Sequence, residues 1–181
     1  MSDIPQFWRS RNFVSLLFMP LATLFATACC IRRVLYRFGV LKTWRAPVPV
    51  IIIGNLTIGG SGKTPLVQAL VSELRKRGVT TGIISRGYGG SAKMATDVAT
   101  CPDATVVGDE PLFLWQMTGA PVVVCKKRIA AAQKLLQDYP ETQLLIADDG
   151  LQHYALVRDV EIVVIAADLG LGNGFPLPAG P

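Results

Sequence analysis

The segment Pro49–Thr64, PVIIIGNLTIGGSGKT, limits the possible folds of this chain more than any other. Its first part, Val50 to Ile53, is apolar and β-branched without alternation, which is typical of a parallel strand covered on both faces. Glycines follow, and their backbone N–H groups, together with those that begin a helix, can surround one phosphate. The segment predicts a strand, a phosphate-binding loop and a helix, with Lys63 reaching the β- and γ-phosphates and Thr64 binding Mg²⁺.

The loop departs at one place from the signature GxxxxGK[ST], because Thr57 occupies the first glycine position. The strand before the loop and the helical spacing of Leu66, Leu70 and Leu74 after it still favour a nucleotide loop. The alternative is an ordinary glycine-rich turn between a strand and a helix. On the first interpretation the nucleotide-binding residues are Thr57, Gly59, Gly60, Ser61, Gly62, Lys63 and Thr64.

Length and composition allow one packed domain with an appendage. The chain has 181 residues, of which 50% are hydrophobic, so it can bury a full core and is too apolar to be disordered. The net charge is +5, and the early cationic residues flank an apolar segment. No base-reading motif follows them. The charge therefore favours an anionic membrane surface as a partner and argues against nucleic acid.

That apolar segment, Phe13–Ile31, carries no charge and has roughly the ~20 residues that a membrane-spanning helix needs. Pro20 in its middle favours a kinked or interfacial helix, so spanning and interfacial forms both stay open. A third possibility is a cleaved signal peptide, with Arg9 and Arg11 before it. Export would separate a nucleotide loop from cytosolic ATP, and the basic residues after the segment favour keeping that side inside.

The four cysteines show no CxxC spacing, and His153 is the single histidine, so the composition argues against a zinc site. We interpret the cysteines as reduced packing residues in a cytosolic compartment. They are Cys29, Cys30, Cys101 and Cys125.

The rest of the chain alternates strands and helices, which predicts an α/β fold: a P-loop NTPase-like, mostly parallel sheet flanked by helices, with ligands at the carboxyl ends of its strands. We expect Gly78 to end the helix Lys63–Arg77, and residues 87–105 to form a loop beside the site. The remaining expected elements are a helix over Arg128–Gln137 and strands over Thr80–Ser85, Thr105–Val107, Ala120–Cys125, Leu144–Ala147 and Glu161–Ala166.

Two acidic pairs follow predicted strands. Asp148 would reach Mg²⁺ beside Thr64, in a Walker B pattern, while Asp149 would position water or substrate; a simple Asp-Gly turn is the alternative. Asp109 and Glu110 lie in the sequence GDEP, where a helix N-cap followed by first-turn acids competes with a catalytic role.

Other polar residues also follow predicted strands, at the edge of the sheet where ligands bind. Arg86 and Tyr88, in SRGYGG, suit a phosphorylated or sugar substrate, or form a simple turn. Gln152 and His153 follow the Walker B run, where the histidine is either a ligand contact or structural. Arg128, at a helix start, is either a phosphate clamp or part of a solvated helix face.

The ordered blocks GNLTIGGSGKTP, SRGYGG, VGDEP, DDGLQHYALVRD and GNGFPLPAGP resemble the tetraacyldisaccharide 4'-kinase family, the lipid A 4'-kinases, over almost the whole chain. The resemblance implies a membrane-associated enzyme on the cytoplasmic face of the bacterial inner membrane. Such an enzyme uses ATP and Mg²⁺ to phosphorylate the 4'-hydroxyl of tetraacyldisaccharide 1-phosphate, a lipid A precursor, giving lipid IVA in lipopolysaccharide biosynthesis.

The resemblance also implies residue roles. Asp109 would be the catalytic carboxylate, assisted by Lys63, and Glu110 would help to hold the metal. Thr64, Asp148 and Asp149 would belong to the metal and γ-phosphate site. The run before GNG, AADLGL, lacks the arginine usual in the family. Substrate or phosphate contacts would come from Tyr88, Arg128, Gln152 and His153.

The expected organisation has three parts: residues 1–46 as a membrane-associated helical segment, 47–166 as the kinase core, and 167–181 as a connector. Family chains continue past LPAGP into a second lobe with a histidine partner for the catalytic aspartate. We therefore expect this chain to be a fragment or a truncated gene product.

Two other classes of protein carry similar loops. A membrane-recruited P-loop regulatory ATPase has KGGxGK[ST], and here Ile58 occupies its signature lysine position. A GTPase metallochaperone would need the guanine-reading motif [NT]KxD, which does not occur in the sequence.

Overall fold

The computed structural model describes residues 5–56, 62–167 and 170–181. It divides into two compact units. The α/β unit comprises Thr43–Gly54 and Lys63–Ile162, and the terminal unit comprises Met1–Lys42, Asn55–Gly62 and Val163–Pro181. The predicted loop residues Thr57, Gly59, Gly60 and Ser61 lie outside the described residues.

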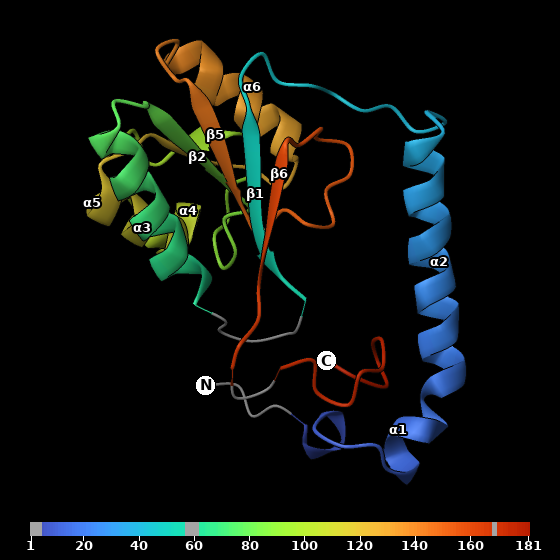
Figure 1. Cartoon of the computed structure of the whole chain (residues 1–181). Helices are drawn as coiled ribbons and strands as arrows, with labels where there is room; N and C mark the ends of the chain where they lie inside the picture. The colour runs from blue at the N-terminus through green and yellow to red at the C-terminus, as the bar shows by residue number, and fades with distance from the viewer. Residues whose placement is uncertain (1–4, 57–61, 168–169) are drawn as a thin grey trace. The chain divides into compact units, whose positions relative to one another are not determined.

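The described residues form a six-stranded sheet with the order β3-β4-β2-β5-β1-β6 (Figure 1). β1 pairs with β5, β5 with β2 and β2 with β4 in parallel, while β3 is antiparallel to β4. The mostly parallel sheet predicted from the sequence is thus confirmed. The strands are β1 (Val50–Asn55), β2 (Thr81–Ser85), β3 (Thr96–Asp97), β4 (Val122–Val124), β5 (Leu144–Asp148) and β6 (Val160–Val164).

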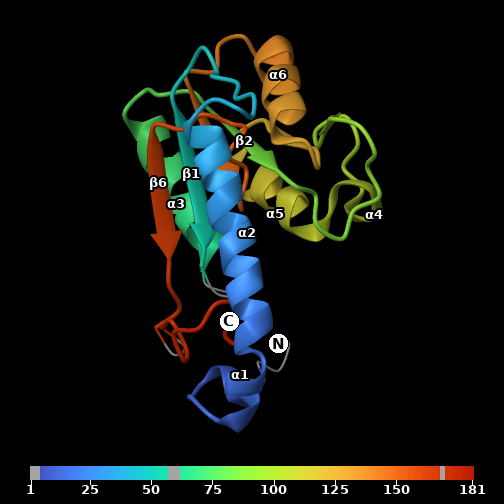
Figure 2. The ribbon, with the colours of Figure 1, turned by 90° about the vertical axis from the view of Figure 1, so that its right-hand side faces the viewer.

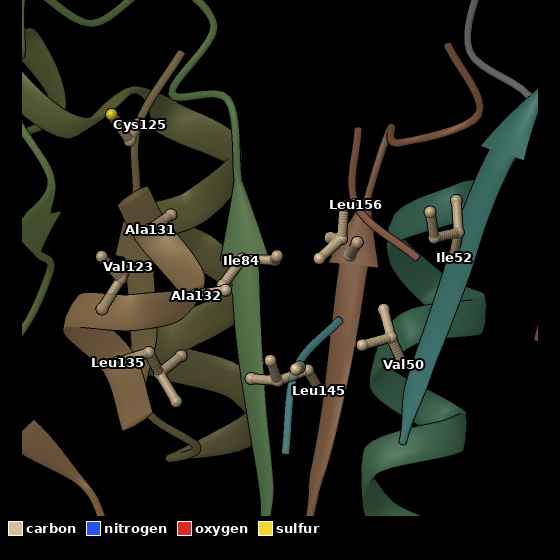
Figure 3. Packing of buried hydrophobic residues seen from close by; sticks show 12 residues of the cluster. Val50, Ile52, Ile84, Val123, Cys125, Ala131, Ala132, Leu135, Leu145 and Leu156 are labelled. Atoms are coloured by element: carbon tan, nitrogen blue, oxygen red, sulfur yellow. The ribbon is translucent and has the colours of Figure 1, made fainter. Parts of the chain in front are cut away.

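Helices cover both faces of the sheet in the α/β unit. Successive strand residues point to opposite faces, and Ile83 and Ile84 of β2 are both fully buried. Figure 3 shows Ile84 and Val123 on the face covered by α6, where Leu135 also fills the space over Gly82. α3 packs against β2, β5 and α5. These helices are α3 (Lys63–Lys76), α5 (Asp109–Thr118) and α6 (Arg128–Asp138).

The secondary structure predicted for two segments is wrong. The expected strand Thr105–Val107 is a short helix, α4 (Ala104–Val107), because the Asp103 side chain accepts a hydrogen bond from Thr105 N at 2.8 Å and caps it. The expected loop over residues 87–105 contains β3, which pairs with β4 at its edge. Both segments are short and have little hydrophobic periodicity, so a capping hydrogen bond in one and strand pairing in the other determine the structure.

The terminal unit holds a broken apolar helix (Figure 2). A 3-10 turn, η1 (Gln6–Trp8), precedes α1 (Phe13–Leu17) and α2 (Met19–Arg37). The break at Phe18, with Pro20 in the first turn of α2, agrees with the expected kink. Among the described residues, α2 is the one helix long and apolar enough to cross a membrane.

The cysteines match the packing interpretation only in part. All four are free, and Cys125 is buried in the hydrophobic core of the α/β unit. Cys29 and Cys30, however, are exposed on α2, so the packing interpretation does not hold for them within the described residues. They lie on a helix whose only buried residue is Ala22.

Residues 170–181 pack against the start of the chain within the terminal unit. Asn173 N donates to Trp8 O at 2.8 Å, and Trp8 Nε1 donates to Pro178 O at 3.0 Å. The Asn173 side chain is buried and donates to Phe7 O at 3.1 Å and Ala179 O at 2.8 Å. A dense hydrogen-bonded contact therefore joins two segments that are far apart in sequence.

Candidate phosphate and metal site

The carboxyl ends of β1 and β5 lie side by side in the α/β unit. Ile53 of β1 is in register with Asp148, the last residue of β5. Lys63 begins α3 directly after the glycine loop, and Gly62 before it has φ +80°, a left-handed conformation that favours glycine. In parallel sheets this edge is where ligands bind.

Lys63 and Asp149 form an ion pair at this edge. The distance between Lys63 Nζ and Asp149 Oδ1 is 2.8 Å, and the lysine side chain is only 16% exposed. The Asp149 backbone has φ +54°, and its N–H donates to Ile53 O at 2.9 Å. The predicted phosphate-binding lysine is thus fixed beside the end of β5.

Thr64 and Glu110 join the first turns of α3 and α5. Thr64 Oγ1 donates to Glu110 Oε1 at 2.5 Å. Asp109 is the first residue of α5 and is exposed, so both acids occupy the first turn of the helix. The N-cap is Gly108, and no side chain caps the helix, so only the first-turn part of the capping alternative agrees with the structure. The structure nevertheless brings Glu110 to the loop helix, although GDEP follows a helix and not the predicted strand.

Backbone packing joins the SRGYGG and VGDEP motifs. Gly108 has φ +92°, and a β-carbon there would lie 2.5 Å from Tyr88 O. A β-carbon at Gly90 would collide with Val106 O. These glycines allow the two loops to approach each other closely, which places Tyr88 near the start of α5.

Asp148 is a buried carboxyl group with a free oxygen. It is 1% exposed, Ser85 Oγ lies 3.5 Å from Oδ2, and Oδ1 has no hydrogen-bond partner among the described residues. Burial raises its pKa to about 6, and the Glu110 charge adds to this rise, while Lys63 lowers it. Ser85, the last residue of a strand, was not among the predicted site residues.

The oxygen atoms at this edge fit a divalent cation. Magnesium prefers oxygen ligands and is usually held by one or two carboxylates together with substrate phosphates. Asp148 Oδ1, the Thr64 hydroxyl and the Glu110 carboxylate supply such oxygens. In the part of the chain that the structure describes, no three acidic, histidine or cysteine side chains form a closed metal cage. The arrangement therefore suits a metal that is shared with a bound phosphate.

The structure contradicts one of the two alternatives predicted for Arg128, the solvated helix face, while the phosphate clamp stays a prediction. Arg128 is 2% exposed, so it does not belong to a solvated helix face. Its guanidinium donates to the backbone carbonyls of Asp148, Asp149 and Cys125 at 2.9, 3.0 and 3.2 Å. Burial lowers its pKa to about 10, against the raising effect of the Asp148 and Asp149 charges.

The other predicted substrate residues lie at the surface of the α/β unit. Arg86, Tyr88 and Gln152 are exposed, and Tyr88 is 83% exposed. His153 is half-buried, donates its backbone N–H to Gly150 O at 3.0 Å, and lines a cavity of about 450 Å³ at the start of α6. These four side chains are therefore accessible to a ligand, wholly or in part.

The mostly parallel sheet, the lysine at the start of α3 and the acidic end of β5 define an α/β protein of the P-loop NTPase-like fold class. Comparison with known proteins identifies its family. The model of the family LpxK, tetraacyldisaccharide-1-P 4'-kinase, matches residues 14–181. The chain belongs to the tetraacyldisaccharide 4'-kinase family, as the motifs suggested.

Curated relatives support this assignment. The tetraacyldisaccharide 4'-kinase of Dichelobacter nodosus is 54% identical over 178 residues, which are 98% of this chain and 53% of that protein. The enzyme of the same name from Aromatoleum aromaticum is 50% identical over 99% of this chain and 53% of its own length. The chain thus spans about half the length of the curated relatives it matches.

A solved structure is similar to the fold described here. The crystal structure of "apo" form LpxK from Aquifex aeolicus, in complex with ATP, has a TM-score of 0.79 and 31% sequence identity. The match covers 93% of this chain and 55% of that one. The P-loop α/β fold predicted from the sequence is therefore confirmed.

Proposed function

We propose that the protein transfers the γ-phosphoryl group of ATP to the 4'-hydroxyl of tetraacyldisaccharide 1-phosphate, giving lipid IVA. The observation that carries the proposal, in a chain of this kinase family, is one connected polar cluster. Lys63 pairs with Asp149, Thr64 bonds to Glu110, and the charges of Lys63 and Glu110 act on the buried Asp148. Phosphoryl transfer needs positioning and charge stabilisation more than covalent chemistry, and these groups supply both.

Each residue has a distinct task in this proposal. Lys63 stabilises the negative charge that develops on the transferred group, and Asp149 holds the lysine amine at 2.8 Å before the phosphate arrives. Thr64, Asp148 and Glu110 would hold Mg²⁺, with Asp149 beside them. When bound, the metal neutralises charge on the phosphates.

The acceptor side requires a base at the surface. Asp109 is exposed at the start of α5 and accepts the proton of the 4'-hydroxyl as its oxygen attacks the γ-phosphorus and ADP leaves. Tyr88 lies near this helix start through the backbone contact at Gly108. With Arg86, Gln152 and His153, it would contact the disaccharide or its phosphate.

A substrate embedded in a bilayer requires an enzyme at the bilayer. α1 and α2 expose large apolar side chains, among them Leu24 (67%) and Phe13 (79%), and arginines flank them. Apolar side chains bury in lipid while arginines attract anionic headgroups. Residues 1–46 would thus hold the kinase core, 47–166, at the cytoplasmic face of the inner membrane.

The test is transfer of ³²P from ATP to tetraacyldisaccharide 1-phosphate by the full-length gene product. Asp109→Asn keeps the shape of the side chain but removes the base, so we expect kcat to fall about 10²-fold or more with little change in nucleotide affinity. Glu141→Gln on the surface is the matched control. A loss of nucleotide affinity alone would make Asp109 a capping or metal residue, and ATP hydrolysis without lipid product would favour a regulatory ATPase.

A further inference from the structure

Arg128 carries a buried positive charge that is directed at the backbone. Its guanidinium is 2% exposed, and the described residues show no ion pair between it and a carboxylate. Three carbonyl oxygens receive its hydrogen bonds instead, those of Asp148, Asp149 and Cys125. Burying a charge is unfavourable, and the Asp148 and Asp149 charges offset that cost only in part, so these three contacts need an explanation other than general stability.

The two contacts at the end of β5 require an unusual backbone. Successive carbonyls of a strand point in opposite directions, yet Arg128 Nη2 binds the carbonyls of Asp148 and Asp149 at 2.9 and 3.0 Å. The two carbonyls converge because Asp149 has φ +54°, a left-handed backbone conformation that residues other than glycine seldom adopt. Arg128 therefore compensates for a backbone conformation that is unfavourable by itself.

The same conformation sets the direction of a site carboxylate. The Asp149 N–H donates to Ile53 O at 2.9 Å, and the Asp149 carboxylate lies 2.8 Å from Lys63 Nζ. The backbone after Asp149 has little room to shift, because Gly150 packs closely on β1 and a β-carbon at Gly150 would lie 3.1 Å from Ile52 Cγ2. A change at the Asp149 carbonyl would thus move the partner of Lys63.

We propose that Arg128 is a positioning residue: it holds the left-handed turn at Asp149 through two carbonyls and so fixes the Asp149–Lys63 pair. This inference rests on the proposed phosphoryl transfer for its effect on turnover. Nη2 uses both of its N–H groups on the backbone, so this nitrogen serves the end of β5, while Nε is buried with no partner among the described residues. Lysine cannot replace Arg128, because one ammonium does not reproduce the planar fork.

Amide hydrogen exchange tests the inference without turnover. In Arg128→Lys and Arg128→Met, we expect exchange at Asp149, whose N–H is bonded to Ile53 O, to accelerate at least tenfold, while Val71 in α3 keeps its rate. Lys127→Met, a neighbouring exposed position, is the matched control and should change neither. Unchanged exchange at Asp149, or equal acceleration at Asp149 and Val71, would overturn the proposal.

Kinetics of the full-length gene product separate positioning from phosphate binding. We expect both Arg128 variants to lower kcat about 100-fold with KM for ATP and lipid within threefold of wild type, because misplacement of site groups acts on the transition state. A raised KM with normal kcat, or near-normal activity of Arg128→Lys, would overturn the positioning role. Absence of product from the wild-type enzyme, with the local exchange effect present, would refute the proposed function alone.

Discussion

The α/β unit and the terminal unit use apolar side chains in opposite ways. In the α/β unit, Ile52 and Leu145 are fully buried between the sheet and its helices. In the terminal unit, Leu21 and Leu24 of α2 are 53% and 67% exposed, although the helix is as apolar as a core element. Large exposed apolar surfaces mark sites of contact with another protein or a membrane. Under the proposed function the partner of α2 is the bilayer, so apolar side chains stabilise the α/β unit from within and bind the terminal unit to lipid.

The largest effect is expected at the phosphate site of the α/β unit. Lys63→Ala removes the charge that stabilises the transferred phosphoryl group, and we expect the rate of transfer by the full-length gene product to fall about 10³-fold. Lys76→Ala, an exposed lysine at the end of the same helix, serves as the control. Near-normal turnover of Lys63→Ala in the ³²P assay would exclude the P-loop interpretation.

A pair of leucine substitutions tests the comparison of the two units directly. Leu145→Ala should lower the free energy of unfolding by about 2–5 kcal/mol, because it leaves a cavity in the core. Leu24→Ala should change it by less than about 0.5 kcal/mol but should lower the fraction bound to anionic vesicles. Urea unfolding and vesicle sedimentation measure the two effects. Equal destabilisation by both would show that α2 packs against protein.

A smaller effect concerns the buried carboxyl group of the α/β unit. Burial raises the pKa of Asp148 from its ordinary value of 3.8 to about 6 in the folded protein. The folded state therefore binds the proton more tightly, and stability should fall as pH rises from about 4 to 6 and stay reduced above that range. Asp148→Asn removes this dependence and should be about 3 kcal/mol more stable at pH 8.

Thermal unfolding of the metal-free chain between pH 4 and 8 measures this difference. Glu141→Gln at the surface is the control and should follow the wild-type pH profile. If Asp148→Asn shows the wild-type fall in stability, the carboxyl group is not the source of it.

Regular patterns in the sequence predicted most of the α/β unit. An unbroken β-branched run identified β1, an apolar run identified β5, and the acidic end of β5 indicated the candidate site. Long-range contacts were not predictable in this way. Arg128 donates its hydrogen bonds to backbone carbonyls, which every residue has, so the residue types in the sequence do not reveal its acceptors. Asn173 and Phe7 are likewise joined through a carbonyl, across 166 positions.

Short segments failed for a different reason. Thr105 has a strand-forming side chain, but its backbone N–H donates a hydrogen bond to the Asp103 side chain. This capping bond is enough to make the four residues of α4 helical. The pairing of Thr64 with Glu110 depends on how α3 and α5 pack, which periodicity does not specify. The sequence thus predicted that Lys63 and Asp148 lie at one edge of the sheet, but it did not predict the contacts of the residues there.

The most direct test of the account is calorimetric titration of ATP into the chain with and without Mg²⁺. The account predicts that Mg²⁺ tightens ATP binding in the wild type, because Asp148 Oδ1 and the Thr64 hydroxyl supply oxygens for a metal shared with the phosphates. In Asp148→Asn this tightening should be lost, while binding of ATP alone persists. Equal ATP affinity with and without Mg²⁺ in the wild type, or an unchanged magnesium effect in Asp148→Asn, would contradict it.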